Sequence, residues 1–191
     1  MENFIYKTTL PDVDLCDEII KYFNNSPNKH RGRVYCEKGG DTIEQPNIKQ
    51  STDLSLDFFT DKEIIEKYIG YLYVVVNEYI EKFKFVNENS KFGVTEQLNI
   101  QHYAPGESFS NWHCERGTPH FPVNTRHLVF ITYLNDVTDA GETEFYYQKL
   151  KITPKRGDTI IFPVDWTYTH RGITSPTQDK YIITGWCNYL P

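Results

Sequence analysis

The chain has 191 residues, with 26 acidic and 20 basic side chains and a formal net charge of −6 at pH 7. This length is enough for one domain with a buried core, and a net negative charge without a long basic run argues against a general nucleic-acid-binding protein. No apolar run is long enough to span a bilayer, and the N-terminus lacks the features of a signal peptide. We therefore expect a cytoplasmic protein whose partners include neither nucleic acid nor membrane.

The first half of the sequence predicts two helices separated by a polar segment. Residues 13–23 carry leucine, isoleucine and phenylalanine at helical spacing, and a turn-rich stretch follows them. Residues 24–54 are polar and predict a loop with one short strand at residues 33–36. Residues 61–85 carry a long apolar stripe, which predicts a helix that covers a sheet.

From Lys91 onward the sequence predicts strands. Residues 94–103 alternate between apolar and polar side chains, as a half-buried strand does. Similar patterns predict strands at residues 125–135, 142–147, 158–162 and 180–188. Two helices followed by several short strands predict a mainly β fold with supporting α, in which antiparallel layers are buttressed by the N-terminal helices. We expect a single domain over residues 1–191, with helical support and loops in residues 1–90 and the β part, which carries the candidate site, in residues 91–191.

The sequence around His113 offers two side chains that suit a metal ion. If residues 113–115 form a strand, His113 and Glu115 point to one face while Cys114 points to the other. A distant His170 would complete a set of two histidines and one carboxylate, which leaves open positions on Fe(II) for substrate and O₂. Because His-x-Glu pairs also occur by chance, the alternative is two histidines hydrogen-bonded in a β core and a glutamate exposed to solvent.

A series of short motifs follows in one order along the C-terminal half of the chain. They are 101–106 (QHYAPG), 113–115 (HCE), 133–137 (YLNDV), 140–145 (AGETEF), 154–158 (PKRGD), 170–172 (HRG) and Lys180. As an ordered set, these motifs resemble the 2-oxoglutarate- and Fe(II)-dependent dioxygenases, specifically the prolyl-4-hydroxylase-like branch, over residues 96–186. The chain departs from the family pattern at Glu115, where the family carries aspartate, and at Ala140, where it carries the first of two glycines.

The resemblance implies a distorted double-stranded β-helix, or jelly roll, with the metal near one open end. It implies that His113, Glu115 and His170 are catalytic residues that hold Fe(II). It further implies that 2-oxoglutarate is a cosubstrate whose far carboxylate meets Lys180. The residues implied to bind this cosubstrate are Tyr103, Tyr133, Thr143 and Lys180.

Strand parity is consistent with part of this assignment. Tyr133 shares a strand face with Ile131, and Lys180 shares one with Ile182, so both side chains belong on faces that could line an interior. A buried lysine without a carboxylate partner is costly, and a bound dicarboxylate would help to explain it. The alternatives are a lysine that snorkels at a strand edge and tyrosines that form ordinary aromatic core.

The resulting hypothesis is a non-haem Fe(II)- and 2-oxoglutarate-dependent dioxygenase that hydroxylates a C–H bond and releases succinate and CO₂. Its substrate would be a peptide or protein, with a proline-containing one favoured, or a small molecule, and ascorbate would support activity. The alternatives are a cupin-like metalloenzyme that does not use 2-oxoglutarate and a non-catalytic jelly-roll binding module. Residues 28–50, 116–124 and 165–169 are the candidate loops around the metal, and the sequence indicates no oligomeric state.

Overall fold

A large antiparallel sheet forms the centre of the structure. The computed structural model describes residues 2–35, 42–88 and 90–190. The strands of the large sheet run in the order β1 (Tyr6–Thr9), β11 (Asp158–Pro163), β8 (Arg126–Tyr133), β13 (Lys180–Tyr189), β7 (Leu98–Tyr103), β5 (Thr52–Leu56) and β2 (His30–Arg31), and β6 (Phe92–Val94) pairs with the far end of β13. β13 therefore lies at the middle of the sheet and contacts β8 on one side and β7 on the other.

Smaller elements complete the β structure. A three-stranded antiparallel sheet has the order β10 (Leu150–Ile152), β9 (Thr143–Phe145) and β12 (His170–Gly172), and β3 (Val34–Tyr35) pairs with β4 (Thr42–Ile43). Two short 3₁₀ turns, η1 (Val123–Thr125) and η2 (Trp166–Tyr168), precede β8 and β12. The small sheet lies across from the large one, so that the two enclose a second core between them.

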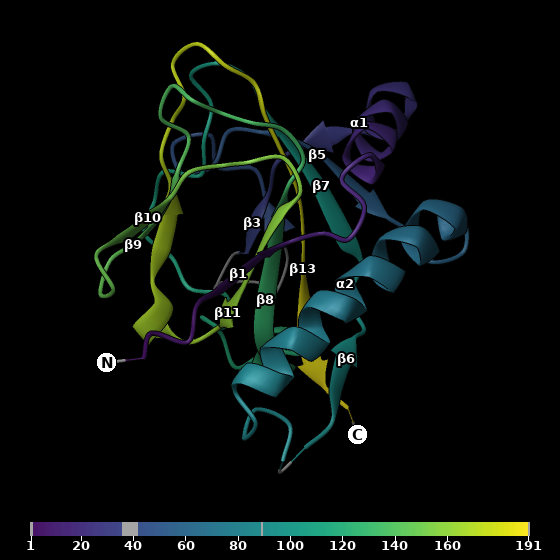
Figure 1. Cartoon of the computed structure of the whole chain (residues 1–191). Coiled ribbons are helices and arrows are strands. Elements are labelled where there is room, and N and C mark those ends of the chain that lie inside the picture. Colours follow the sequence, from purple (N-terminus) through teal and green to yellow (C-terminus); the bar gives the residue numbers. More distant parts are fainter. Residues whose placement is uncertain (1, 36–41, 89, 191) are drawn as a thin grey trace.

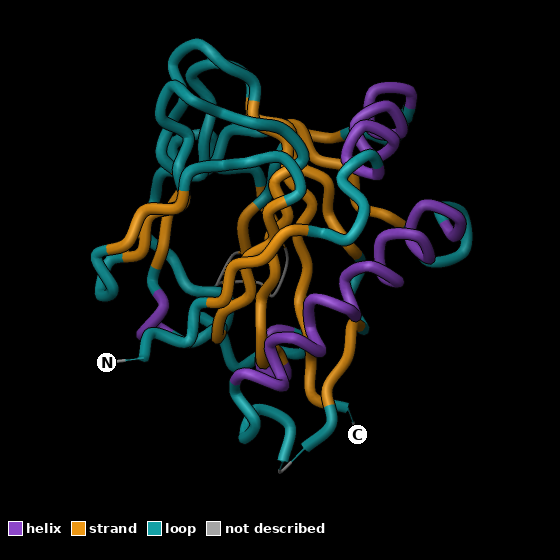
Figure 2. The backbone as a smooth tube through the Cα atoms, in the orientation of Figure 1, coloured by secondary structure: helices purple, strands orange, loops and turns teal. Residues whose placement is uncertain are grey.

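Two helices cover the other face of the large sheet. Figure 1 shows α1 (Leu15–Asn25) and α2 (Lys62–Lys82) on one side of the sheet, with β9 and β10 on the opposite side, and Figure 2 shows the same layers by element type. The helices bury the apolar stripes that the sequence predicts, including Ile19 and Phe23 of α1 and Tyr68 and Leu72 of α2. None of the helices in the described part of the chain is both long and apolar enough to cross a membrane.

Alternation along the central strands separates two cores. Ile183 of β13 and Phe130 of β8 join the core under the helices, whereas Ile182 of β13 and Ile131 of β8 join the core between the sheets. Because neighbouring residues of a strand point to opposite faces, each central strand contributes to both cores. The even-numbered side chains of β13 from Lys180 to Trp186 therefore face the interior between the sheets, where the cavity described below lies.

The structure confirms the mainly β fold with two supporting helices and corrects several boundaries. The predicted strand at residues 94–103 is two strands, β6 and β7, which pair with opposite ends of β13. β2 and β4 lie inside the segment 24–54, where the sequence predicts a loop, and β5 begins at its end; β1 and β10 also have no counterpart among the predicted strands. The short strand expected at residues 33–36 is present as β3, while residue 36 lies outside the described residues.

Candidate active site

The two segments that carry the candidate metal ligands lie side by side. His113 and His170 exchange main-chain hydrogen bonds, with N···O distances of 3.0 and 2.9 Å, and form an isolated antiparallel bridge. Glu115 N donates to Val164 O at 3.1 Å, which anchors the next turn of the chain. Residues 113–115 thus do not form a strand, because one bridge and one anchoring bond replace a continuous ladder. The bridge alone brings the two histidines together.

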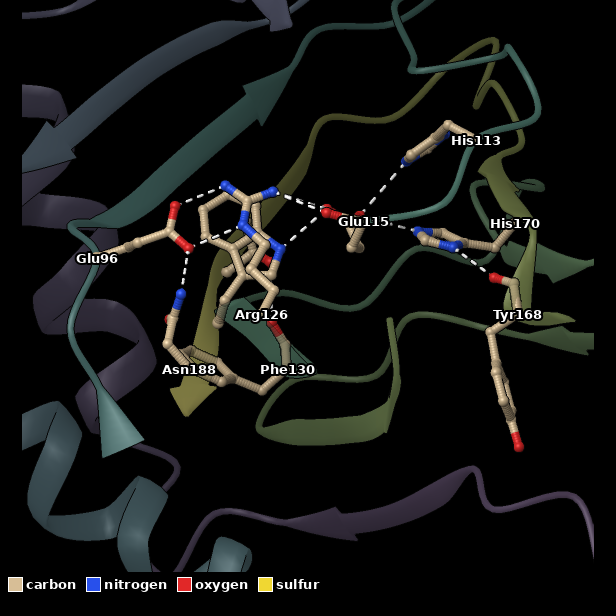
Figure 3. Close-up of polar contacts among 10 residues, drawn as sticks. Glu96, His113, Glu115, Arg126, Phe130, Tyr168, His170 and Asn188 are labelled. Atoms are coloured by element: carbon tan, nitrogen blue, oxygen red, sulfur yellow. Dashed lines mark hydrogen bonds and ion pairs between the residues drawn. The ribbon is translucent and has the colours of Figure 1, made fainter. Parts of the chain in front are cut away.

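The three side chains converge on one point. One ligand atom from each of His113, Glu115 and His170 lies within 4.8 Å of the other two. Oε1 of Glu115 is 3.6 Å from Nε2 of His113 and 3.3 Å from Nε2 of His170. Figure 3 shows both imidazole rings directed at the Glu115 carboxylate. Two nitrogen donors and one oxygen donor thus face a common position. This arrangement suits a divalent metal ion that keeps other coordination positions open.

Hydrogen bonds to main-chain carbonyls set the tautomer of both imidazoles. Nδ1 of His113 lies 2.9 Å from Asn111 O, and Nδ1 of His170 lies 3.0 Å from Tyr168 O. A carbonyl oxygen only accepts, so each Nδ1 carries the hydrogen and each Nε2 presents a lone pair toward Glu115. Such a bond on the far ring nitrogen is the usual means by which proteins orient a metal-binding histidine.

Burial and mutual contact hold His113 and Glu115 in the protonation states that metal ligands need. Burial, reinforced by the neighbouring His170, lowers the pKa of His113, so its ring is neutral near pH 7. Burial acts to raise the pKa of Glu115, but the contacts of its carboxylate with the His113 and His170 rings outweigh this effect and hold that pKa well below its usual range. A neutral imidazole and an ionised carboxylate are the forms that bind a metal.

The three side chains line a cavity of about 1050 Å³ between the two sheets. Lys180 lies in the same cavity, 7% exposed, and its ammonium donates to Gly141 O at 2.7 Å. Burial lowers the pKa of Lys180 to about 8, with a smaller opposing effect from Glu142. No carboxylate of the described residues lies within ion-pair distance of this ammonium. The cavity thus offers a buried cationic donor to an anion.

The three remaining predicted cosubstrate residues surround this lysine but differ in access to the cavity. Tyr103 and Thr143 are among its lining residues, whereas Tyr133 is wholly buried behind them. The Tyr133 hydroxyl donates to Thr143 Oγ1 at 2.7 Å, and the Tyr103 hydroxyl donates to Gln101 Oε1 at 2.6 Å. Nζ of Lys180 lies 5.8 and 5.7 Å from the ring centroids of Tyr103 and Tyr133. Tyr133 therefore does not line the cavity itself, and its hydroxyl contacts the lining residue Thr143.

The cavity wall contains residues that the sequence patterns do not single out. Residues from the predicted loops 28–50 and 116–124 line it, whereas none from residues 165–169 does. Arg126 forms an ion pair with Glu96 at 2.6 Å. Trp186 shares a strand face with Lys180, and that parity is the one sequence signal that could have placed it here. Glu96 and Lys49 carry no such signal.

Comparison with known proteins gives consistent results. Residues 98–188 match the model of the "2OG-Fe(II) oxygenase superfamily". A curated relative, "Probable prolyl 4-hydroxylase 9" of Arabidopsis thaliana, is 25% identical in an alignment 115 residues long that covers 48% of this chain and 40% of that protein. The chain therefore matches less than half of that relative's length.

Solved structures share the whole fold at low sequence identity. A viral collagen prolyl hydroxylase from Paramecium Bursaria Chlorella virus-1, solved as a 2OG complex, has a TM-score of 0.69 at 20% identity, over 98% of this chain and 97% of that one. A Pseudomonas putida prolyl-4-hydroxylase has a TM-score of 0.71 at 14% identity, over 99% and 94%. A Trichoplax adhaerens prolyl hydroxylase, in complex with a hypoxia inducible factor peptide fragment, has a TM-score of 0.75 at 16% identity, over 97% and 84%.

Proposed function

Because residues 98–188 match the model of the 2OG-Fe(II) oxygenase superfamily, we propose that this chain belongs to that superfamily and is an Fe(II)- and 2-oxoglutarate-dependent dioxygenase that hydroxylates a C–H bond. The observation that carries the proposal is one cavity lined by His113, Glu115 and His170 together with the buried ammonium of Lys180. This combination supplies a metal site and an anion site in one cavity. The facing sheets also support a jelly roll, the fold expected for such an enzyme.

The donor set fits Fe(II) in particular. Two imidazole nitrogens and one carboxylate oxygen form the three-ligand set of non-haem iron oxygenases, whereas a structural zinc site closes with a fourth protein ligand. The described residues place no fourth histidine, cysteine or acidic side chain in this group. The positions that the protein leaves open would be available to cosubstrate, O₂ and water. When bound, the metal would couple decarboxylation of 2-oxoglutarate to succinate and CO₂ with hydroxylation of the substrate.

The residues proposed to bind the cosubstrate are buried side chains that donate hydrogen bonds. Lys180 would bind the far carboxylate of 2-oxoglutarate, with the Thr143 hydroxyl beside it and Tyr133 orienting that hydroxyl. Tyr103, on the strand next to Lys180, would close the wall of the site. A buried lysine gains most from a carboxylate partner, because the interaction offsets the cost of removing its charge from water.

The substrate that the relatives favour is a proline within a peptide or protein. One relative is described as a probable prolyl 4-hydroxylase, and one structural neighbour is described with a peptide fragment bound. Residues of the segments 28–50 and 116–124 also line the cavity and would be the ones to contact a peptide. We propose ascorbate as the reductant that sustains repeated turnover in an assay.

A thermal-shift titration tests this function before any substrate is known. Mn(II), a redox-inert substitute for Fe(II), should raise the melting temperature, and 2-oxoglutarate should raise it further only when Mn(II) is present, since a ligand that binds the native state stabilises it. His170→Ala should abolish both increments, and Lys180→Ala should remove the 2-oxoglutarate increment while keeping that of Mn(II). Succinate release with Fe(II), ascorbate and proline-containing peptides then tests turnover.

Each other outcome has a defined meaning. A response to Mn(II) with none to 2-oxoglutarate would favour a metalloenzyme of the cupin type. Binding of both without succinate release from any peptide would favour a non-catalytic module. A protein that responds to neither would overturn the proposal. His113, Glu115 and His170 would then bind no metal, and Lys180 would bind no cosubstrate.

A further inference from the structure

Glu115 has one methylene more than the aspartate of the family pattern, and its two carboxylate oxygens have different partners. Oε1 faces Nε2 of both histidines, at 3.6 and 3.3 Å. Oε2 accepts a hydrogen bond from Nε1 of Trp186 at 2.9 Å. The indole N–H therefore engages one oxygen and leaves the other directed at the point where the imidazoles converge. A carboxylate held by one oxygen in this way presents a single, oriented ligand atom.

Arg126 contacts Glu115 and the indole together. Its Nη1 donates to the main-chain oxygen of Glu115 at 3.0 Å and lies 3.8 Å from Oε2 of the same residue. Its guanidinium carbon is 3.4 Å from the ring centroid of Trp186, which is a stacked cation–π contact. The guanidinium thus fixes the main chain of Glu115. It also stacks on the ring of Trp186, whose N–H binds the Glu115 side chain.

Arg126 is itself held from behind by an acidic side chain. Nε and Nη2 donate to the two carboxylate oxygens of Glu96 at 2.8 and 2.6 Å, a bidentate pair (Figure 3). Asn188 donates to Glu96 in turn at 2.9 Å. The side chains of Arg126 and Glu96 are each 13% exposed, and that of Glu115 is 15% exposed. Bidentate, largely buried pairs of this kind are far more rigid than surface ion pairs.

An irregularity in β8 places Arg126 on the cavity side. Cys187 of β13 pairs with Leu128, but the next residue, Asn188, pairs with Arg126, so His127 is an extra residue in β8. Such a bulge reverses the side-chain alternation beyond it. Without it, Arg126 would point to the helix side of the sheet, away from Glu115. The bulge is therefore part of the arrangement that brings the guanidinium to the carboxylate.

We propose that Trp186, Arg126 and Glu96 form a brace that positions Glu115 as a metal ligand, and that this brace is matched to glutamate rather than aspartate. The proposal rests on the proposed function, because it assigns these residues to the same metal site. The extra methylene allows Oε2 to reach the indole while Oε1 still faces the two imidazoles. An aspartate at this position would withdraw its carboxylate from the indole by one bond. Trp186 and Arg126 are thus positioning residues that act on the metal through Glu115.

Mn(II) affinity, measured by calorimetry, tests the brace without any turnover. Trp186→Phe removes the N–H and keeps an aromatic ring under Arg126, so we expect Mn(II) binding to weaken by about tenfold, the usual size of such outer contacts. Glu96→Gln should weaken binding in the same direction, since it frees Arg126 without touching Glu115. The visible absorption of a Co(II)-substituted protein should change in both variants, because the carboxylate then binds in a different orientation.

Two comparisons separate positioning from general damage. Trp166→Phe makes the same change at an exposed tryptophan beside the other ligand segment, and it should leave Mn(II) affinity unchanged. In a Glu115→Asp background, Trp186→Phe should cause little further loss, because the shortened carboxylate has already left the indole. The melting temperature of each metal-free variant reports any loss of folding separately.

The outcomes of this proposal and of the proposed function are distinguishable. Wild-type protein that binds no Mn(II) would overturn both. Normal binding by the wild type and equal binding by Trp186→Phe would overturn the brace alone. Equal losses from Trp186→Phe in the wild-type and Glu115→Asp backgrounds would also overturn it, since residues that act through one contact must show coupled effects.

Discussion

At the level of single residues, the lowered pKa of Lys180 leads to a testable prediction about cosubstrate binding. The fold buries its ammonium against a single carbonyl, that of Gly141, and burial lowers its pKa from 10.5 to about 8. The charged form therefore destabilises the free protein below pH 8, and this destabilisation is relieved as the pH rises from about 8 toward 10.5. A bound carboxylate reverses the preference, because it favours the protonated lysine.

This sign predicts how 2-oxoglutarate affinity depends on pH. Affinity should be constant from about pH 6.5 to 8 and should then fall by up to about tenfold per pH unit, since the deprotonated amine must first take up a proton. Titrations of the Mn(II)-loaded protein with 2-oxoglutarate at several pH values measure it. Lys180→Arg is the matched control, because a guanidinium stays protonated throughout this range and the fall should disappear. Full wild-type affinity at about pH 9.5 would contradict the assignment.

Among the elements, β13 is the strand on which both cores and both ligand sites depend. It pairs with β8 and β7 and carries Lys180 and Trp186 on its cavity face. On its helix face, Gly185 lies so close to β8 and β7 that an added Cβ would meet Phe130 Cζ at 2.6 Å and Leu98 Cδ2 at 2.9 Å. The absence of a side chain at this position lets these large apolar groups pack against the strand.

Gly185→Ala should therefore destabilise the protein. Forcing a methyl group into this contact should lower the free energy of unfolding by about 1–3 kcal/mol, the usual cost of overpacking. Gly70→Ala is the matched control, because Gly70 lies exposed within α2 with nothing within 4 Å of the added Cβ, and it should raise the free energy by about 0.5–1 kcal/mol. Urea unfolding curves measure both. Equally small changes in the free energy of unfolding for the two variants would show that the packing around residue 185 can accept a methyl group.

Across the whole molecule, burial decides what a charge contributes. Lys49 and Asp53 form an ion pair of 2.6 Å whose side chains are 4% and 2% exposed, and both line the cavity. Ser51 and Asn99 also donate to the Asp53 carboxylate. Lys62 and Glu66 have the same spacing in the chain, but their side chains are each 67% exposed on α2. Both pairs join a lysine to an acidic residue at i and i+4, and their surroundings differ.

Lys49→Met and Lys62→Met should have very different effects. The first leaves a buried carboxylate without its cation and should cost about 3–5 kcal/mol of stability, whereas the second should change stability by less than about 0.5 kcal/mol. Adding Asp53→Asn to Lys49→Met should restore part of the loss, since the unpaired charge is then removed. Chemical unfolding of the four proteins, wild type included, checks this. If Lys49→Met causes little loss of stability, water must reach the Asp53 carboxylate freely.

Local sequence patterns were sufficient to predict the class of fold and the residues of the triad. The apolar stripes of α1 and α2 and the alternation in β8 and β13 arise from neighbours in the chain, so their periodicity can be read without the structure. The ordered motifs similarly indicated His113, Glu115 and His170 as a set, and the structure brings these three together. Residues 113–115 do not form the strand that the expectation of a shared face assumed, because one bridge to His170, and not a local pattern, shapes that segment.

The surroundings of the triad, in contrast, became visible only in the folded chain. β1 and β5 are short strands whose partners lie far along the chain, so their pairing leaves little local pattern. Trp186 and Glu96 reach Glu115 and Arg126 across strands, and a bulge of one residue determines whether Arg126 reaches the cavity at all. Patterns within a segment reflect contacts between close neighbours, whereas the orientation of a ligand and the burial of a charge depend on residues that folding alone brings together.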